Sequence, residues 1–238
     1  MKKILISGGE GKFAQSILKN NKKYKIFTPN KKKMNISNFK SILNYIKKTK
    51  ANYLIHSAAL TSPMEQHKKK IIKSINTNII GTANIVNACH LTKIKLIYIS
   101  TNFVYPGIKG NYKEEDSLLP VNAYGWSKLG GECAVRLYNK SLILRICMID
   151  DKYPHKKAYE NYITSFLNKT DAARIVLKII DKIGIYNIGG KVQSAYKYAK
   201  KNNGRIKKTF INKKKILEIG KNTSININKL KKLNINNE

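Results

Sequence analysis

Short apolar runs alternate with helical patterns over the first sixty residues. Runs at 3–7, 24–28 and 52–57 are typical of strands, and the patterns at 12–20 and 36–48 have helical spacing. Strands that alternate with helices favour a parallel sheet whose two faces are both covered by helices. We therefore expect an α/β fold with a doubly wound parallel sheet.

The alternation continues to about Asp150 and is weaker beyond it. A long helical pattern covers 69–91, a strand pattern 95–100, a helix 123–138 and a strand 141–146. Later residues predict a helix at 170–182, a strand at 185–188 and a lysine-rich tail that still contains apolar positions. The sequence thus predicts a large domain over 1–148 and a small, shortened part over 149–238. Residues 170–190 are expected to pack back on the large domain.

Length and composition fit this division. A chain of 238 residues can bury a full core. It has no apolar stretch long enough to cross a membrane, and its start, MKKILISGG, does not resemble a signal peptide. Cys89, Cys133 and Cys147 lack the spacing of a zinc site or a disulfide framework. We expect a cytoplasmic protein without a metal site or a membrane partner.

The formal charge of +34 would ordinarily suggest a nucleic-acid partner. However, the lysines are spread over the whole chain, and the arginines are few: Arg136, Arg145, Arg174 and Arg205. Nucleic-acid sites favour arginine for its fork of donors. The charge therefore indicates compositional drift, and no nucleic-acid partner is expected. A basic surface can still steer an anionic substrate toward a cleft.

A glycine-rich turn follows the first predicted strand directly and leads into a helix. In such a turn Gly8 permits the tight bend, Gly11 lets the backbone approach a pyrophosphate, and the small Ala14 allows close packing of helix on strand. The position at the first βα junction predicts a dinucleotide site. The expected cofactor-binding residues here are Gly8, Gly11, Lys12, Phe13 and Ala14.

The second strand does not end in the acidic residue that would bind the ribose hydroxyls of NAD. It ends in Ile26-Phe27-Thr28-Pro29-Asn30, and Lys31, Lys32 and Lys33 follow. A cation at this place can accept the 2′-phosphate of NADP. The residues favour NADP(H) and leave NAD(H) open.

A tyrosine and a lysine are spaced by one helical turn at the start of the helix predicted for 123–138. In Tyr124-Gly125-Trp126-Ser127-Lys128 the two side chains share one face, and a nearby ammonium is expected to lower the pKa of the phenol. Tyr124 could then pass a proton to a carbonyl oxygen, and Lys128 could also hold the cofactor ribose. Thr101, at the carboxyl end of a buried strand, could bond the same oxygen.

Several motifs in one order resemble the dTDP-4-dehydrorhamnose reductase branch of the extended short-chain dehydrogenases. The similarity runs from Lys3 to about Arg145 and resumes faintly near residues 170–190. The segments that carry it are 100–107 (STNFVYPG), 114–116 (EED), 120–132 (PVNAYGWSKLGGE), 56–61 (HSAALT) and 78–82 (NIIGT).

This resemblance implies a Rossmann-type sheet and NAD(P)H-dependent reduction of a 4-keto-6-deoxy nucleotide sugar. It implies Thr101, Tyr124 and Lys128 as catalytic positions, with Tyr124 as the proton donor. From the matching loop and helix it also implies cofactor contacts at Ala58, Ala59 and Asn78, in addition to Tyr124 and Lys128.

Departures from related patterns narrow the chemistry. Similar dehydratases carry an Asp-Glu pair after the threonine, where this chain has Asn102 and Phe103. The GDP-fucose synthase type would place a cysteine in this loop, and none occurs between Ser100 and Gly110. Reductases of this branch usually have Asp in place of Asn102, and the segment 150–169 is short for a substrate-binding insertion.

Two other functions remain open from the sequence. A nucleotide-sugar 4-epimerase would use the same tyrosine and lysine. A non-catalytic NADP-binding regulatory subunit, similar to that of methionine adenosyltransferase, would keep the fold without needing a tuned phenol. The sequence does not decide whether the chain forms a homodimer.

Overall fold

Six parallel strands form the centre of the computed structural model, which describes residues 1–234. The chain moves outward from β1 to β2 and then returns to the other side of β1, so the winding direction changes between β1 and β3. The predicted doubly wound parallel sheet is confirmed. In sheet order the strands are β10 (Gly184–Ile188), β5 (Ser141–Ile146), β4 (Lys95–Thr101), β3 (Tyr53–His56), β1 (Lys3–Ser7) and β2 (Lys25–Phe27).

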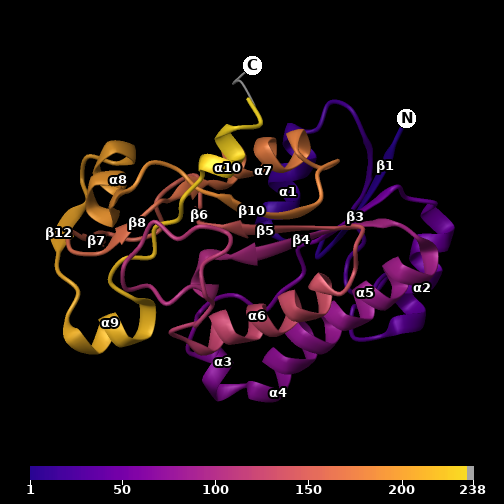
Figure 1. The fold of residues 1–238 in the computed structure, drawn as a ribbon, viewed down its shortest axis with the longest axis horizontal. Coiled ribbons are helices and arrows are strands. Elements are labelled where there is room, and N and C mark those ends of the chain that lie inside the picture. Colours follow the sequence, from indigo (N-terminus) through magenta and orange to yellow (C-terminus); the bar gives the residue numbers. More distant parts are fainter. Residues whose placement is uncertain (235–238) are drawn as a thin grey trace.

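Helices cover both faces of this sheet (Figure 1). On one face, α1 (Lys12–Asn20) and α7 (Lys169–Lys178) pack over a core of isoleucine, leucine and alanine side chains. On the other, α2 (Phe39–Thr49), α5 (Gly81–Thr92) and α6 (Ala123–Arg136) enclose a second core. The strands are buried on both faces, which explains their nearly continuous apolar runs.

The region predicted as one helix over 69–91 is broken into several pieces. Its elements are α3 (Gln66–Lys69), α4 (Ile71–Ser74), a π-helical turn called η1 (Ile75–Ile80) and α5. Lys70 leaves the helical conformation, with φ −127° and ψ 57°. A π-turn adds one residue to a turn of an α-helix and is frequent at functional sites. One inserted residue changes the spacing of apolar positions too little to be recognised, so the sequence pattern could not reveal the π-turn.

Two glycines let α6 approach its neighbours closely. A Cβ atom on Gly131 would lie 2.5 Å from the carbonyl oxygen of Asn78 and 2.8 Å from the hydroxyl oxygen of Tyr98. A Cβ atom on Gly130 would lie 2.9 Å from the side chain of Ile79. Backbone contact therefore fixes the distance between α6, η1 and β4.

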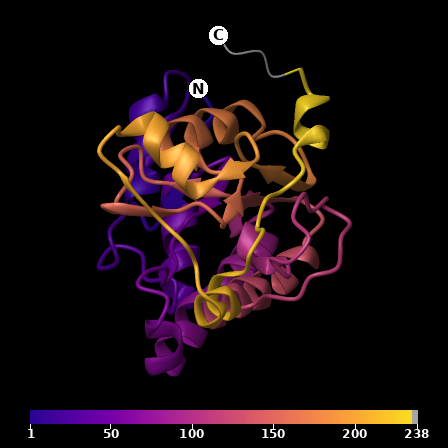
Figure 2. The same ribbon diagram turned by 90° about the vertical axis from the view of Figure 1, so that its left-hand side faces the viewer.

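A smaller part lies at the carboxyl edge of the sheet, at the left of Figure 1. It consists of short strand pairs and short helices, and Figure 2 shows α9 well separated from α8. The prediction for 149–238 extends to 235–238, which lie outside the described residues. The elements are β6 (Met148–Ile149), β7 (Lys157–Tyr159), β8 (Ile163–Thr164), β9 (Leu167–Asn168), β11 (Gln193–Ser194), α8 (Ala195–Asn202), β12 (Lys207–Thr209), α9 (Lys213–Ile219) and α10 (Asn228–Lys231).

The segment predicted at 170–190 contains α7 and β10. Strand β10 pairs with β5 along its whole length, and α7 packs on α1. Within residues 1–234, no helix is long and apolar enough to cross a membrane.

Candidate active site at the carboxyl edge of the sheet

The glycine turn packs directly against the loop that follows β3. Gly8 has φ +71°, and a Cβ atom there would lie 2.7 Å from the Cα of Ala58. The amide of Gly11, which precedes the first turn of α1, donates to the carbonyl of Gly8 at 2.9 Å. No side chain fits at Gly8 because Ala58 already occupies the space, so this glycine lets the turn pack directly against the loop after β3.

Gly9 is a member of the turn that sequence reasoning did not single out. A Cβ atom on Gly9 would lie 2.6 Å from the carbonyl carbon of Thr28. The adjacent pair Gly8-Gly9 was the available signal. The turn therefore depends on contact with both β2 and β3 connections.

A cavity of about 310 Å³ opens beside the turn. The glycine turn, the loop after β2 and the loop Ser57–Leu60 line it, and the last of these contributes Ala58 and Ala59. Lys31 and Lys73 approach the same cavity from separate elements. Its walls can hold a nucleotide whose phosphates lie at the start of α1.

The three residues after Gly11 do not line this cavity. Phe13 and Ala14 are buried in the core beneath α1, while the amine of Lys12 forms a 2.8 Å ion pair with Asp150. The side chains of Phe13 and Ala14 thus pack in the core, and that of Lys12 binds Asp150 on the surface. Any cofactor contact from these positions would come through the backbone of the first helical turn.

Asn78 joins two parts of the site from its place in η1. Its amide accepts from the backbone N–H of Leu60 at 2.8 Å and donates to the carbonyl of Leu60 at 2.9 Å. It also donates to the hydroxyl of Ser127 at 2.8 Å. This buried amide holds the cavity loop against the helix that carries Tyr124, which is a positioning role.

Thr101 and Tyr124 lie together at the carboxyl end of β4, whereas the amine of Lys128 lies over the ring of Tyr98. Thr101 is the last residue of β4, and Tyr124 lies in the first turn of α6, one turn before Lys128. Asn122 caps α6 by accepting from the backbone N–H of Gly125 at 2.8 Å. Tyr124 and Thr101 share a side-chain hydrogen bond.

The protonation states differ from the sequence expectation. Burial raises the pKa of Tyr124 to about 12, and the hydrogen bond with Thr101 only partly opposes this shift. Burial also lowers the pKa of Lys128 to about 7, against the attraction of Glu132. Lys128 is not among the groups that shift the pKa of Tyr124, so the expected lowering of the phenol pKa by this lysine is wrong: burial and the hydrogen bond with Thr101 determine the shift. Tyr124 is therefore fully protonated at neutral pH.

Aromatic rings hold both side chains in place. The Tyr124 ring contacts His67 and Phe103, with centroid distances of 5.3 and 6.2 Å. The amine of Lys128 lies 4.2 Å from the ring centroid of Tyr98. Nothing in the sequence pattern identified His67, which is buried and bonded to Ser74 and to the carbonyl of Thr61.

A buried ion pair supports the strands beneath these residues. Arg145 of β5 binds Glu132 of α6 at 2.7 Å, and Glu132 also accepts from the hydroxyl of Ser100 at 2.8 Å. Arg145 continues to the hydroxyl of Tyr105 and the carbonyl of Glu114. Both charges are completely buried, so their hydrogen bonds must be nearly complete. The GGE sequence in α6 was the signal for Glu132.

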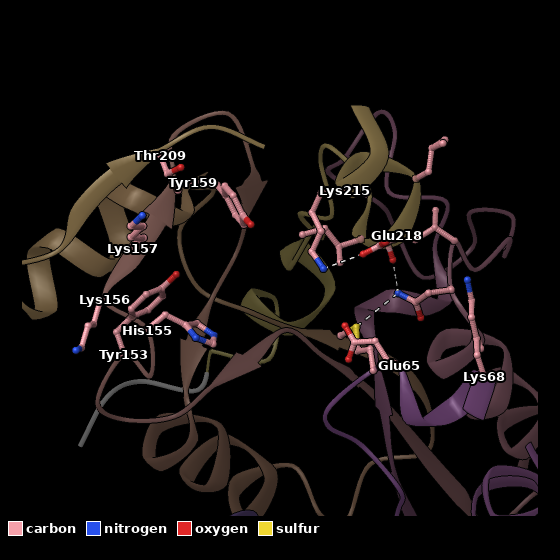
Figure 3. Close-up of a pocket in the computed structure, with 16 residues that line it drawn as sticks. Glu65, Lys68, Tyr153, His155, Lys156, Lys157, Tyr159, Thr209, Lys215 and Glu218 are labelled. Atoms are coloured by element: carbon pink, nitrogen blue, oxygen red, sulfur yellow. Dashed lines mark hydrogen bonds and ion pairs between the residues drawn. The ribbon is translucent and has the colours of Figure 1, made fainter. Parts of the chain in front are cut away.

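A second, larger cavity of about 750 Å³ lies beside the first turn of α6 (Figure 3). Tyr153, His155, Lys157 and Tyr159 project from one side. On the opposite side α9 contributes an ion pair of 2.8 Å between Lys215 and Glu218, and the α3 region contributes Glu65 and Lys68. The lining combines aromatic rings with several cations, which suits an anionic ligand that has a ring to stack.

The fold and these two cavities define a nucleotide-binding α/β protein of the extended short-chain dehydrogenase class. The chain belongs to the family described as RmlD substrate binding domain, whose model matches residues 1–185. The sequence resemblance is thereby confirmed.

Curated relatives agree with this family. The chain is 28% identical over 199 residues to a dTDP-4-dehydrorhamnose reductase of Aggregatibacter actinomycetemcomitans, covering 82% of this chain and 66% of the relative. It is 30% identical over 191 residues to the spore coat polysaccharide biosynthesis protein SpsK of Bacillus subtilis, covering 77% and 64%. The match spans just under two thirds of the length of these relatives.

A solved structure shares the fold over the whole chain. It is the dTDP-4-dehydrorhamnose reductase of Bacillus anthracis in complex with NADP, with a TM-score of 0.86 and 23% identity. The superposition covers 100% of this chain and 94% of that one. The C-terminal part of this chain therefore shares that fold as well.

Proposed function

We propose that the protein reduces the keto group of a 4-keto-6-deoxy nucleotide sugar with NADP(H). The observation that carries this proposal is the position of Tyr124. It lies in the first turn of α6, beside the larger cavity, and Asn78 ties this helix to the loop that lines the nucleotide cavity. A reduction needs a hydride source on one side of the carbonyl and a proton donor on the other.

The residues of the first cavity fit a dinucleotide. Gly8, Gly9 and Gly11 all line this cavity, so phosphates could approach their backbone at the start of α1. No acidic residue follows β2, whereas Lys31 and Lys73 both line the cavity, which favours the 2′-phosphate of NADP(H). NAD(H) is the alternative cofactor. When bound, the reduced nicotinamide supplies a hydride.

The chain's own residues supply the proton and hold the oxygen. Tyr124, protonated because its pKa is about 12, donates a proton to the substrate oxygen as negative charge develops on it. Thr101 hydrogen-bonds the same oxygen and orients the phenol. The buried amine of Lys128 can hold a ribose hydroxyl, and in its charged form it stabilises the phenolate that remains.

The larger cavity fits the nucleotide sugar. Lys156, Lys157 and Lys68 can balance a diphosphate, and Tyr153 or Tyr159 can stack on a base or a sugar ring. The relatives named as reductases act on a substrate of this type. The short segment 150–169 contributes much of this lining, so a shortened insertion still supplies a polar wall.

The test is NADPH and NADH oxidation, followed by absorbance, with a panel of 4-keto-6-deoxy nucleotide sugars. Turnover that yields the reduced sugar with NADPH supports the proposal. Binding of NADPH without turnover of any sugar would overturn it. Interconversion of sugars with retained cofactor and no net oxidation would indicate a 4-epimerase instead.

A non-catalytic regulatory subunit is the second candidate. Its support is the similarity to the methionine adenosyltransferase 2 subunit beta of Xenopus laevis, at 26% identity over 155 residues, covering 61% of this chain and 46% of that protein. The buried hydrogen bond between Tyr124 and Thr101 argues for the reductase, because a scaffold has no need of it. The turnover assay separates the two.

We also propose that the chain is a homodimer through α5 and α6, which lie side by side. Large apolar side chains are exposed there: Ile80, Leu91, Trp126 and Leu137. Sedimentation should give twice the monomer mass, and Trp126→Glu combined with Leu137→Glu should restore the monomer. A monomeric wild type would refute this.

We further propose that the protein is cytoplasmic and that it does not bind nucleic acid. Three free cysteines in the described residues are consistent with a reducing compartment. The positive charge has no arginine cluster behind it. Retention of DNA at physiological salt would contradict the second part.

A further inference from the structure

Two asparagines beside the catalytic positions bind the C-terminal part of the chain. The side chain of Asn122, two residues before Tyr124, donates to the carbonyl of Glu218 at 2.9 Å. The side chain of Asn102, directly after Thr101, donates to the carbonyl of Thr223 at 3.0 Å. Both acceptors belong to one segment, 218–223, which contains the last two residues of α9 and the four residues that follow it.

Each of these amides also accepts a hydrogen bond on its catalytic side. The Oδ1 atom of Asn122 caps α6, and that of Asn102 accepts from the hydroxyl of Thr101 at 3.4 Å. A side chain with both an acceptor and a donor is required for this double role, and a carboxylate cannot donate. An aspartate at either place would keep the bond to the catalytic element and lose the bond to segment 218–223.

Segment 218–223 continues the wall of the larger cavity. Glu218 and Ile219 line the cavity, and Glu218 lies across it from Lys157 and Tyr159 (Figure 3). The far end of the segment is fixed by the hydroxyl of Thr223, which lies 2.8 Å from that of Tyr162. The segment is thus held at both ends and touches the catalytic elements through two amides.

We propose that Asn102 and Asn122 are positioning residues that couple the wall of the substrate cavity to the proton donor. The inference rests on the proposed function of that cavity as the nucleotide-sugar site. Movement of segment 218–223 away from α6 would widen the cavity and break the bonds through which Asn122 and Asn102 connect this wall to α6 and to the end of β4.

The coupling gives a reason for the departure at Asn102. Reductases of this branch usually have Asp here, and an aspartate would face the carbonyl of Thr223 with a second acceptor. Asn102 is buried, so an unpaired acceptor at this place would be costly. In this chain the neutral amide of Asn102 stands in place of a carboxylate and forms a hydrogen bond to the carbonyl of Thr223.

The test compares Asn102→Asp and Asn122→Asp with the wild type in the full chain. Aspartate is a good helix cap, so Asn122→Asp should keep α6 intact. Loss of one buried hydrogen bond should raise KM for the sugar about tenfold and accelerate amide hydrogen exchange over 213–226 about tenfold. The Kd of NADPH should stay unchanged, and kcat should fall less than KM rises.

Two further variants distinguish loss of the hydrogen bond to segment 218–223 from the effect of an added charge and from a general effect on folding. Asn122→Ser keeps a neutral cap but is too short to hold Glu218, so it should reproduce the effects of Asn122→Asp. Asn212→Asp makes the same chemical change at the exposed cap of α9, where the side chain accepts from Lys215, and should alter neither readout.

Hydrogen exchange tests whether Asn102 and Asn122 hold segment 218–223, even if the enzyme turns over no sugar. Unchanged exchange over 213–226 in both aspartate variants would overturn the proposal. Faster exchange with an unchanged KM would overturn the coupling to substrate. Absence of wild-type turnover would instead refute the proposed function and leave the exchange result to decide whether Asn102 and Asn122 hold the segment.

Discussion

The cavity proposed for the cofactor and the cavity proposed for the substrate are built in opposite ways. At the glycine turn, side chains are removed so that backbones touch, and the hydrogen bond from Gly11 to Gly8 spans three residues. At segment 218–223, side chains reach across the chain, because Asn102 and Thr223 are 121 residues apart. The first region can therefore be recognised from adjacent residues, although Gly8 and Gly9 also pack on the distant Ala58 and Thr28. The second region consists of contacts between residues far apart in the sequence.

This contrast explains how far the sequence could be interpreted. The helix of α1, the strand β4 and the spacing of Tyr124 and Lys128 follow from periodicity and adjacent residues, and the structure has them as predicted. The helices α8 and α9 were missed, because short lysine-rich helices carry little apolar periodicity. The wall of the substrate cavity was missed with them.

The prediction that the pKa of Tyr124 is lowered was wrong for a related reason. The spacing placed Lys128 near Tyr124, and a charge effect was expected. Residue spacing does not measure burial, which raises the pKa of Tyr124 and lowers that of Lys128. Burial is a property of the assembled layers, so a spacing rule could not supply it.

The largest effect is expected at Tyr124, where the two regions meet. Tyr124→Phe should lower kcat by about 10³-fold, because general acid catalysis contributes on this scale. NADPH binding should persist, since the glycine turn is untouched. Steady-state kinetics and cofactor titration measure both. Tyr45→Phe on α2 is the matched control, and equal losses in the two variants would contradict the assigned role.

The next effect concerns the charge pair that supports both regions. Arg145→Met removes the buried cation that binds Glu132 at 2.7 Å and leaves this carboxylate only the half-exposed Arg136 at 3.5 Å. It should lower the free energy of unfolding by about 3–5 kcal/mol. Urea denaturation measures this. Arg174→Met removes an exposed arginine paired with Asp171 and should cost at most about 1 kcal/mol. Similar losses would mean that burial of the pair contributes nothing.

Gly8→Ala tests the locally specified region alone. The positive φ and the contact with Ala58 should make it less stable by about 1–3 kcal/mol and weaken NADPH binding more than tenfold. Hydrogen exchange over 213–226 should not change. Gly204→Ala, where a Cβ atom has open space, is the control. Retained NADPH affinity in Gly8→Ala would argue against the turn as the phosphate site.

The smallest effect is a pH dependence from Lys128. Its pKa is about 7 when folded and near 10.5 when unfolded, so the unfolded chain binds more protons between these values. Stability should therefore rise with pH, by about 1 kcal/mol per unit between pH 7 and 9. Denaturation of the wild type and Lys128→Met at several pH values measures this slope. An identical slope in the variant would show that Lys128 is not the cause.

Gly131 has a consequence for how this sequence can change over evolutionary time. The contact of its backbone with Asn78 sets the spacing between α6 and the π-turn η1. Side chains elsewhere on the surface take no part in that spacing. Lysines can therefore accumulate over the exterior, up to the present charge of +34, without altering the distance between these two elements.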